Sequence, residues 1–363
     1  MKFSSVRIIF ILVICTGLIG IENAACGHLP TSEAEKYRVT FGESYIDFLP
    51  GSLIRMEVIF KNNVSKNIQV SQELVVLDST KNKVWKTIIN LSLAPEDSST
   101  IQFMVPVPKV PGCYTLTLGK TANQGFLSIP KRIFNAIQPT KSPRLEKILV
   151  HTPDSEAELN AFLKTWTIKA PAFSWAQVLL LGKTSWRLFT TGDQQITQLI
   201  NRALRREMSV IFLDFGPAED KSDFVLPFDI SVRFVPFSSP EKNFILKSGF
   251  HELNYGLTTG RIDKWNGFEG ITVPAEEMKF EGKGVKIVAL ATTNGNTVRF
   301  PLVEINPQYG KGKLYLCQLI TDGRLDQDIQ PPRYKPGVPA YDPMSVQFLL
   351  NLISASVGDN LLK

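Results

Sequence analysis

Residues 314–325 read LYLCQLITDGRL. The apolar run at its start gives way to the polar and small residues Thr321, Asp322, Gly323 and Arg324. An apolar run of this kind is typical of a strand that is buried on both faces, as in a parallel sheet covered by helices. Such sheets bind their ligands at the carboxyl ends of the strands. The stretch therefore predicts a fold class and also where a functional site would lie.

The same pattern extends over residues 145–358, where apolar runs alternate with helical periodicity. Further buried strands are predicted at residues 147–152, 178–181, 210–214, 285–291 and 302–305. Ser155 and Glu158 form a capping box before one predicted helix, Asp193 is placed to cap another, and a last helix is predicted from Pro343 to Ser356. We therefore expect an α/β domain with a mostly parallel sheet and flanking helices.

The preceding part of the chain has a different period. Between residues 37 and 130, apolar and polar residues alternate, as in Ile54, Met56, Val58 and Phe60, and turn signals separate the runs. Six or seven short alternating strands in this length predict an all-β immunoglobulin-like sandwich. Residues 131–144, which contain two prolines, are predicted to be a linker between the two domains.

The first 25 residues have the pattern of a secretory signal peptide, with Lys2 and Arg7 before the apolar run 8–21. Residues 26–36 are then an N-terminal linker, and residues 359–363 a tail. Cys26 directly follows two alanines, so two outcomes remain open: lipidation of Cys26, or ordinary cleavage that leaves a free thiol. We expect a secreted or periplasmic protein, or one lipid-anchored in a bacterial envelope. In this prediction a lipidated Cys26 is the sole membrane attachment.

Composition excludes several classes of function. The formal charge is +6, but the basic residues are scattered, and we predict no nucleic-acid partner. Four cysteines and three histidines form no pattern of metal-ligand spacing, so no metal site and no cofactor are predicted. Phosphate-binding glycine motifs are absent from the sequence.

The strand at 210–214 ends at the position where α/β hydrolases carry their nucleophile. That turn needs a serine or cysteine between small neighbours, whereas this chain has Asp214 followed by Phe215, Gly216 and Pro217. Cys317 lies within its predicted strand and is expected to pack as a small apolar side chain. We therefore assign no catalytic residue.

Four residues remain as candidates for ligand binding: Asp214, Trp265, Asp322 and Arg324. Asp322 and Arg324 follow a strand end and can bind a polar ligand, but they can equally pair with each other or cap the loop. Trp265 offers an aromatic face for a sugar ring, or a packing anchor. His151, at another strand end, is expected to bond a neighbouring loop.

Three segments resemble the C-terminal region of secreted bacterial glycoside hydrolases of the family-two and β-galactosidase type. They are FHELNYGLTTGRIDKWNG (250–267), KGKLYLCQLITDGRL (311–325) and YDPMSVQFLLNLI (341–353). The segment FLPGSLIRMEVIFKNN (48–63) resembles the immunoglobulin-like domains of the same enzymes. The resemblance implies a class I glutamine-amidotransferase-like fold for the second domain. A catalytic (β/α)₈ barrel takes about 250 residues, for which this chain has no room.

These observations lead to a secreted, non-catalytic accessory protein that binds carbohydrate, or that binds or assembles with a protein such as a glycoside hydrolase subunit. The alternative is a hydrolase of glycosides or esters with a non-standard site at the strand carboxyl ends. A third reading is a structural module that oligomerises through the sandwich edge.

Overall fold

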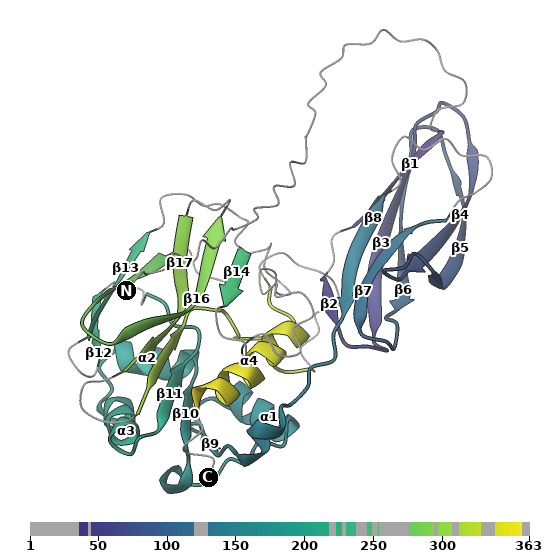
Figure 1. Cartoon of the computed structure of the whole chain (residues 1–363). Coiled ribbons are helices and arrows are strands. Elements are labelled where there is room, and N and C mark those ends of the chain that lie inside the picture. The colour runs from purple at the N-terminus through teal and green to yellow at the C-terminus, as the bar shows by residue number, and fades with distance from the viewer. Residues whose placement is uncertain are drawn as a thin grey trace, which may run out of the picture. The chain divides into compact units, whose positions relative to one another are not determined.

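The computed structural model describes residues 36–42, 45–119, 130–217, 223–226, 230–236, 245–248, 253, 276–293, 297–306, 312–327 and 338–357 (Figure 1). The predicted signal peptide, the N-terminal linker up to residue 35, Cys26 and the tail lie outside these residues. Among the helices that the structure describes, none is both long and apolar enough to cross a membrane. The protein is mostly β, with several separate sheets.

The first part of the described chain forms two sheets. One has the order β1-β3-β6 and the other the order β2-β8-β7-β4-β5. Their strands are β1 (Tyr37–Phe41), β2 (Asp47–Phe48), β3 (Leu53–Asn62), β4 (Ile68–Leu77), β5 (Lys83–Leu93), β6 (Ser98–Pro106), β7 (Gly112–Leu118) and β8 (Lys131–Ala136).

The predicted alternation explains how these two sheets pack. In β3 the side chains of Ile54, Met56, Val58 and Phe60 are buried. They join two apolar clusters that also contain Leu74, Val76 and Leu116 of the five-stranded sheet. Because successive side chains of a strand point to opposite faces, one face of β3 packs in these clusters and the other faces outward. The all-β prediction for this region is confirmed.

The predicted linker 131–144 is wrong over its first six residues. Residues 131–136 form β8, which pairs antiparallel with β7 and parallel with β2. Phe134 and Ala136 are buried while Ile133 is exposed, so this segment has the same period of two as the strands before it. The prolines that suggested a linker lie beyond the strand. Residues 143–147 form a short 3₁₀ helix, η1 (Pro143–Lys147).

A seven-stranded sheet organises the second part of the chain, in the order β14-β16-β17-β18-β11-β10-β9. These strands are β9 (Val150–His151), β10 (Val178–Leu181), β11 (Ser209–Phe212), β14 (Ile245–Ser248), β16 (Val285–Thr293), β17 (Thr297–Ile305) and β18 (Leu314–Cys317). The strands β9, β10, β11 and β18 are mutually parallel, whereas the pairs β18–β17, β17–β16 and β16–β14 are antiparallel.

The prediction of a mostly parallel sheet is therefore wrong for half of it. Three residues separate β16 from β17, and eight separate β17 from β18. A parallel connection needs a crossover of a dozen residues or more, whereas antiparallel neighbours can be joined by a short turn. Chain length between the strands decides their direction here.

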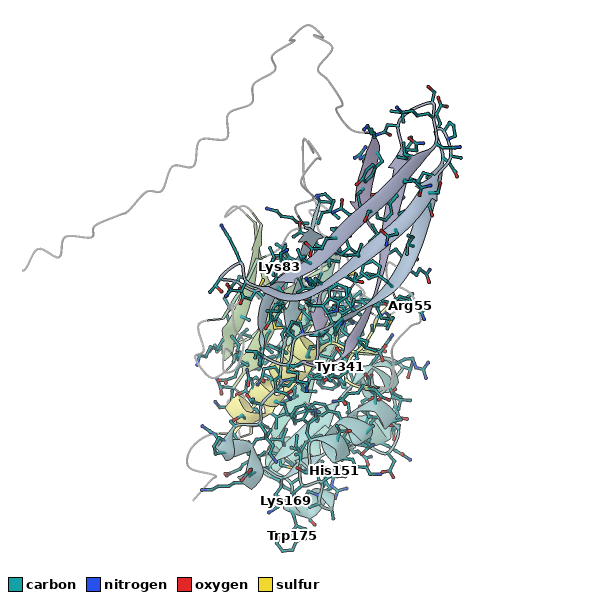
Figure 2. All side chains as sticks on the ribbon, turned by 90° about the vertical axis from the view of Figure 1, so that its right-hand side faces the viewer. Arg55, Lys83, His151, Lys169, Trp175 and Tyr341 are labelled. Carbon is teal, nitrogen blue, oxygen red and sulfur yellow. The ribbon has the colours of Figure 1, made fainter. Side chains whose placement is uncertain are left out.

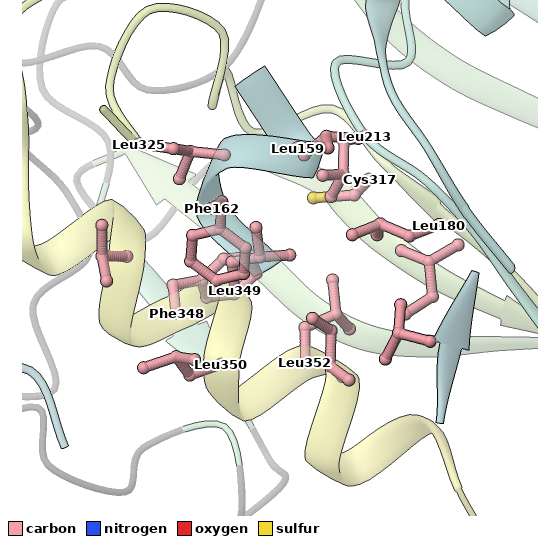
Figure 3. Packing of buried hydrophobic residues seen from close by; sticks show 14 of the residues in the cluster. Leu159, Phe162, Leu180, Leu213, Cys317, Leu325, Phe348, Leu349, Leu350 and Leu352 are labelled. Carbon is pink, nitrogen blue, oxygen red and sulfur yellow. The ribbon is translucent and has the colours of Figure 1, made fainter. Parts of the chain in front are cut away.

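Apolar side chains on each face of this sheet meet a different layer. On one face, Val178, Leu180 and Cys317 pack against helices α1 (Ala157–Thr165) and α4 (Pro343–Ser356) (Figure 3). On the other face, Leu179 and Phe212 pack against helices α2 (Lys183–Thr190) and α3 (Gln194–Arg205). A three-stranded antiparallel sheet shares this second layer and consists of β12 (Asp223–Leu226), β13 (Ile230–Pro236) and β15 (Glu276–Glu281).

The predicted helix 343–356 is confirmed as α4, and almost every one of its residues is buried. Its buried polar side chains are satisfied by other segments. The Gln347 side chain accepts from the Thr140 amide at 2.6 Å and donates to the Thr140 carbonyl at 3.0 Å. It also donates to Asn351, whose amide in turn donates to the Leu253 carbonyl. These bonds fix residue 140 and residue 253 against α4.

Candidate functional site at the strand carboxyl ends

The carboxyl ends of the four parallel strands lie along one edge of the sheet. The register pairs Leu181 of β10 with Phe212 of β11, and Phe212 with Leu316 of β18. The segments that leave these ends begin with Gly182 after β10, with residues 213–217 after β11 and with residues 318–325 after β18. Sequence positions more than 100 residues apart therefore meet at this edge.

Asp214 holds the loop that follows β18. Its carboxylate accepts from the Thr321 amide at 2.6 Å, from the Thr321 hydroxyl at 2.8 Å and from the Asp322 amide at 3.3 Å. Burial raises the pKa of Asp214 to about 6, although these hydrogen bonds act in the opposite direction. Asp214 also has a φ of 53°, a left-handed conformation that few non-glycine residues adopt. The turn after β11 thus combines a positive φ with an aspartate side chain, and it carries no serine or cysteine.

The side chain of Asp322 pairs with a lysine that follows a neighbouring strand end. Its carboxylate lies 2.9 Å from the ammonium group of Lys183, the first residue of α2. The hydrogen bond and the charge of Asp322 raise the pKa of Lys183. Both side chains remain largely exposed, and an exposed ion pair contributes at most about 1 kcal/mol to stability.

Arg324 is fully buried behind this pair. Its guanidinium donates to the Ile320 carbonyl at 3.1 Å and to the Asp322 carbonyl at 3.4 Å, which closes the loop on itself. Burial lowers its pKa, while the negative charge of Asp342 and, beyond it, of Asp214 acts in the opposite direction. Asp342 is itself buried and caps α4 through the Met344 and Ser345 amides. Arg324 thus caps the loop, one of the two roles expected for it.

Two glutamates that sequence reasoning did not select also belong to this edge. The Glu158 carboxylate accepts from the Gly323 and Leu325 amides, both at 2.9 Å. The Glu156 carboxylate accepts from the Ser185 amide at 2.6 Å in the first turn of α2. The predicted capping box of Ser155 and Glu158 is wrong, because α1 has Glu156 at its N-cap and no side-chain cap bond there. The available signal was that both glutamates lie at the N-terminal end of the helix that follows a strand.

Side chains and backbone groups of the protein itself occupy the space at the turn after β11. Phe215 is fully buried and its ring centroid lies 4.2 Å from that of Trp186. The Phe215 amide, which in a hydrolase would face an oxyanion, donates to the Cys317 carbonyl at 2.8 Å. Cys317 is fully buried, and burial raises the pKa of its thiol. The prediction that Cys317 packs as a core residue is confirmed.

The structure brings together Asp214, Asp322 and Arg324, three of the four candidate residues. Trp265 lies outside the described residues. His151 bonds a neighbouring loop, as expected, with Nδ1 3.4 Å from the Pro171 carbonyl oxygen. Among the described residues, no three histidine, cysteine or acidic side chains gather in a way that would hold a metal ion.

Chemically, this edge is a set of carboxylates that accept hydrogen bonds from backbone amides. Asp214 and Glu158 together bind the amides of residues 321, 322, 323 and 325. Gly323 is required within that loop, because its φ is 72° and a Cβ there would lie 2.8 Å from Pro339. Lys183 and Asp322 are the charged groups that remain most open to solvent.

Comparisons with known proteins find only partial likenesses. Neither a protein-family model nor a curated protein matches the sequence. A β-glucosidase from Listeria innocua in complex with glucose matches 28% of this chain at 13% identity, with a TM-score of 0.23. A β-glucosidase from Erythrobacter marinus matches with the same values. The match covers 16% of each β-glucosidase chain.

A CARDB domain from Pyrococcus furiosus is matched over 94% of its length. That match covers 28% of the present chain, at 16% identity and a TM-score of 0.23. Likenesses with TM-scores of this size carry no argument about function. The assignment of chemistry to this chain rests on its own residues.

Proposed function

We propose that this chain is a secreted, non-catalytic accessory protein that acts by binding carbohydrate, or by binding or assembling with a protein such as a glycoside hydrolase subunit, in a bacterial envelope. Its second domain would then be a glutamine-amidotransferase-like fold that has kept the strand-end architecture without the reaction. Export rests on the signal-peptide pattern of residues 1–25, and attachment to a membrane would pass through a lipidated Cys26.

One observation supports this proposal above the others: the strand-end turn uses its reactive groups internally. The Asp214 carboxylate accepts three hydrogen bonds from Thr321 and Asp322, and the Phe215 amide is bonded to Cys317. A nucleophile or general base must reach the substrate, and an oxyanion hole needs free donors. A group that positions a loop is not available for either task.

The proposal is tested with the mature chain, its Asp214→Asn variant and the control Asp193→Asn, which makes the same change at the N-cap of α3. We expect no turnover of chromogenic glycosides or esters by any of the three. We also expect the native chain to bind a glycan on an array, or to crosslink to a protein partner. Turnover that Asp214→Asn abolishes and Asp193→Asn leaves intact would contradict the proposal, as would the absence of both glycan and partner.

A hydrolase remains the second candidate, because one observation favours it. Asp214 has a pKa of about 6 and a strained backbone, and perturbed carboxyls at strand ends are common in active sites. Its neighbours Asp322 and Lys183 supply further charge at the surface. In that case the pH profile of turnover by the native chain would show a step near pH 6, and Asp214→Asn would abolish turnover.

A further inference from the structure

Among the tryptophans that the structure describes in the second part of the chain, one projects into solvent at a place that the strand-end site does not use. Trp175 belongs to the 3₁₀ turn η2 (Phe173–Trp175), which leads into β10. Its side chain is 73% exposed, and Figure 2 shows it pointing away from the body of the protein, with Lys169 at the same end. Burying tryptophan is favourable, so a ligand that covers this ring would gain free energy of binding.

Backbone hydrogen bonds and a ring contact hold the turn that carries Trp175. The Trp175 amide donates to the Ala172 carbonyl at 3.0 Å, and the Ala176 amide donates to Phe173 at 3.3 Å. The Phe173 ring meets the ring of His151 edge-on, with their centroids 5.5 Å apart. A ring presented on an ordered turn loses little conformational entropy when it binds.

Two arginines of α3 and its C-cap lie against the same turn. The guanidinium carbons of Arg202 and Arg206 lie 5.1 Å and 5.8 Å from the centroid of the Phe173 ring, a cation–π arrangement. Arg206 also donates to the Ser174 carbonyl at 3.4 Å, which is the residue next to Trp175. Both arginines are exposed, so the guanidinium edges stay open to an anion.

The charge around the turn is positive. Residues 202–207 read RALRRE, with three arginines and Glu207 as the acid among them. Lys169, which is exposed, lies beside β9 through the backbone bond from Val150 to its carbonyl. Fixed cations beside an exposed aromatic ring favour a ligand that carries both an apolar flat face and a negative charge.

We propose that the Trp175 turn, together with Arg202 and Arg206, binds a polyuronate, a polysaccharide whose sugar rings each carry a carboxylate. The indole stacks on the C–H face of a ring, and the guanidinium groups pair with carboxylates, a geometry that arginine matches in a bidentate way. This inference deepens the proposed function and rests on it, because export places the chain among glycans.

A membrane surface fits less well. Binding to a bilayer interface needs several apolar side chains at one level, whereas Trp175 alone among residues 138–217 is a large apolar side chain classed as exposed. Single-stranded nucleic acid would offer stacking and phosphates, but an exported protein meets it rarely. Both serve as comparison ligands in the test.

The test uses the full mature chain and titrates polygalacturonate against the same polymer after methyl esterification, which keeps the rings and removes the charge. The variants are Trp175→Ala and the pair Arg202→Gln with Arg206→Gln. The matched controls are Val225→Ala, which removes another exposed apolar side chain, and Arg187→Gln, which removes an exposed arginine from α2. Circular dichroism verifies that each variant is folded.

We expect the native chain to bind polygalacturonate and to bind the esterified polymer at least about tenfold more weakly. Trp175→Ala and the double arginine variant should each weaken binding of the acid polymer by about tenfold or more, and the two controls should not. Salt at about 0.5 M should weaken it further. Equal binding of the two polymers, no binding of either, or no effect of Trp175→Ala would overturn the inference.

Preferred binding of phosphatidylserine vesicles or of a single-stranded oligonucleotide through the same residues would also overturn it. The test distinguishes a failure of this inference from a failure of the proposed function. A chain that binds a neutral glycan or a protein partner without involving Trp175 refutes this inference alone. Turnover that depends on Asp214 refutes the proposed function and leaves the Trp175 result to stand by itself.

Discussion

Replacing Asp214 by asparagine tests the electrostatic description of the strand-end turn. The side chain is nearly isosteric, and asparagine carries no charge at any pH. Burial raises the pKa of Asp214 from 3.8 to about 6 in the folded protein. Between these values the folded protein keeps a proton that the unfolded chain has released. The contribution of Asp214 to stability is therefore fully present below pH 3.8 and is lost as the pH rises through about 6.

The size of this loss follows from the two pKa values. One pKa unit corresponds to about 1.4 kcal/mol, so moving from 3.8 to about 6 corresponds to ~3 kcal/mol. Asp214 keeps some exposed surface, and we take this figure as an upper bound. The quantity to follow is the unfolding free energy of the native chain minus that of Asp214→Asn. If the substitution also alters the hydrogen bonds to Thr321, it adds a constant to this difference in unfolding free energy and leaves its dependence on pH unchanged.

Urea denaturation followed by tryptophan fluorescence between about pH 4 and about pH 8 gives this difference. We expect it to fall by about 1.5–3 kcal/mol over that range, with most of the change between about pH 4 and about pH 6. Asp193→Asn, which makes the same substitution at the N-cap of α3, controls for the chemistry of the change itself. A difference that stays flat, or that rises with pH, would refute the conclusion that burial outweighs the three hydrogen bonds at Asp214.

Two further predictions concern the core. Cys317 is fully buried with a raised thiol pKa, whereas Cys113 is exposed. Iodoacetamide should therefore label Cys113 in the native protein and leave Cys317 unlabelled until urea is added. Peptide mapping shows which thiol reacts, and equal labelling of both in the native protein would contradict the burial of Cys317. Gln347→Leu removes both bonds to the Thr140 backbone and the bond to Asn351, so we expect a loss of about 2–4 kcal/mol of unfolding free energy. Gln69→Leu, at an exposed β4 position, is the matched control and should cost less than about 0.5 kcal/mol; equal losses would show that the Gln347 bonds contribute little.

Hydrophobic periodicity predicted the helices and strands that bury one face against a neighbouring layer. The alternation in β3 and the helical stripe of α3 each reflect one buried face, and the structure confirms them. The predicted extent of α4 is confirmed, but this helix is buried on nearly all sides. The direction of β16 and β17 was missed, since buried strands are apolar whether their neighbours are parallel or antiparallel. The short spacing between them, which contains Asn294 and Gly295, was the usable signal of a hairpin.

The candidate site was predictable in place but not in detail. Asp214, Asp322 and Arg324 were selected because they follow strand ends, and the shared edge of parallel strands does bring them together. Glu158 was read as a local capping residue, yet its carboxylate bonds amides 165 and 167 residues away. Local rules describe bonds within a few residues, and a carboxylate that bonds a distant loop satisfies none of them. Trp175 was missed because exposure of a single ring has no sequence signature.

The position of α4 has a consequence for how fast the second part of the chain acquires its structure. Its bonds reach Thr140, Ser209 and Leu253 across 207, 147 and 98 residues. Closing such loops costs entropy before any packing is gained, and chains dominated by distant contacts reach their folded state slowly. Until α4 docks, the apolar face of β10, β11 and β18 lacks one of the two helices that cover it. A long-lived intermediate with that face exposed would bind an apolar dye and would be the species most prone to aggregate.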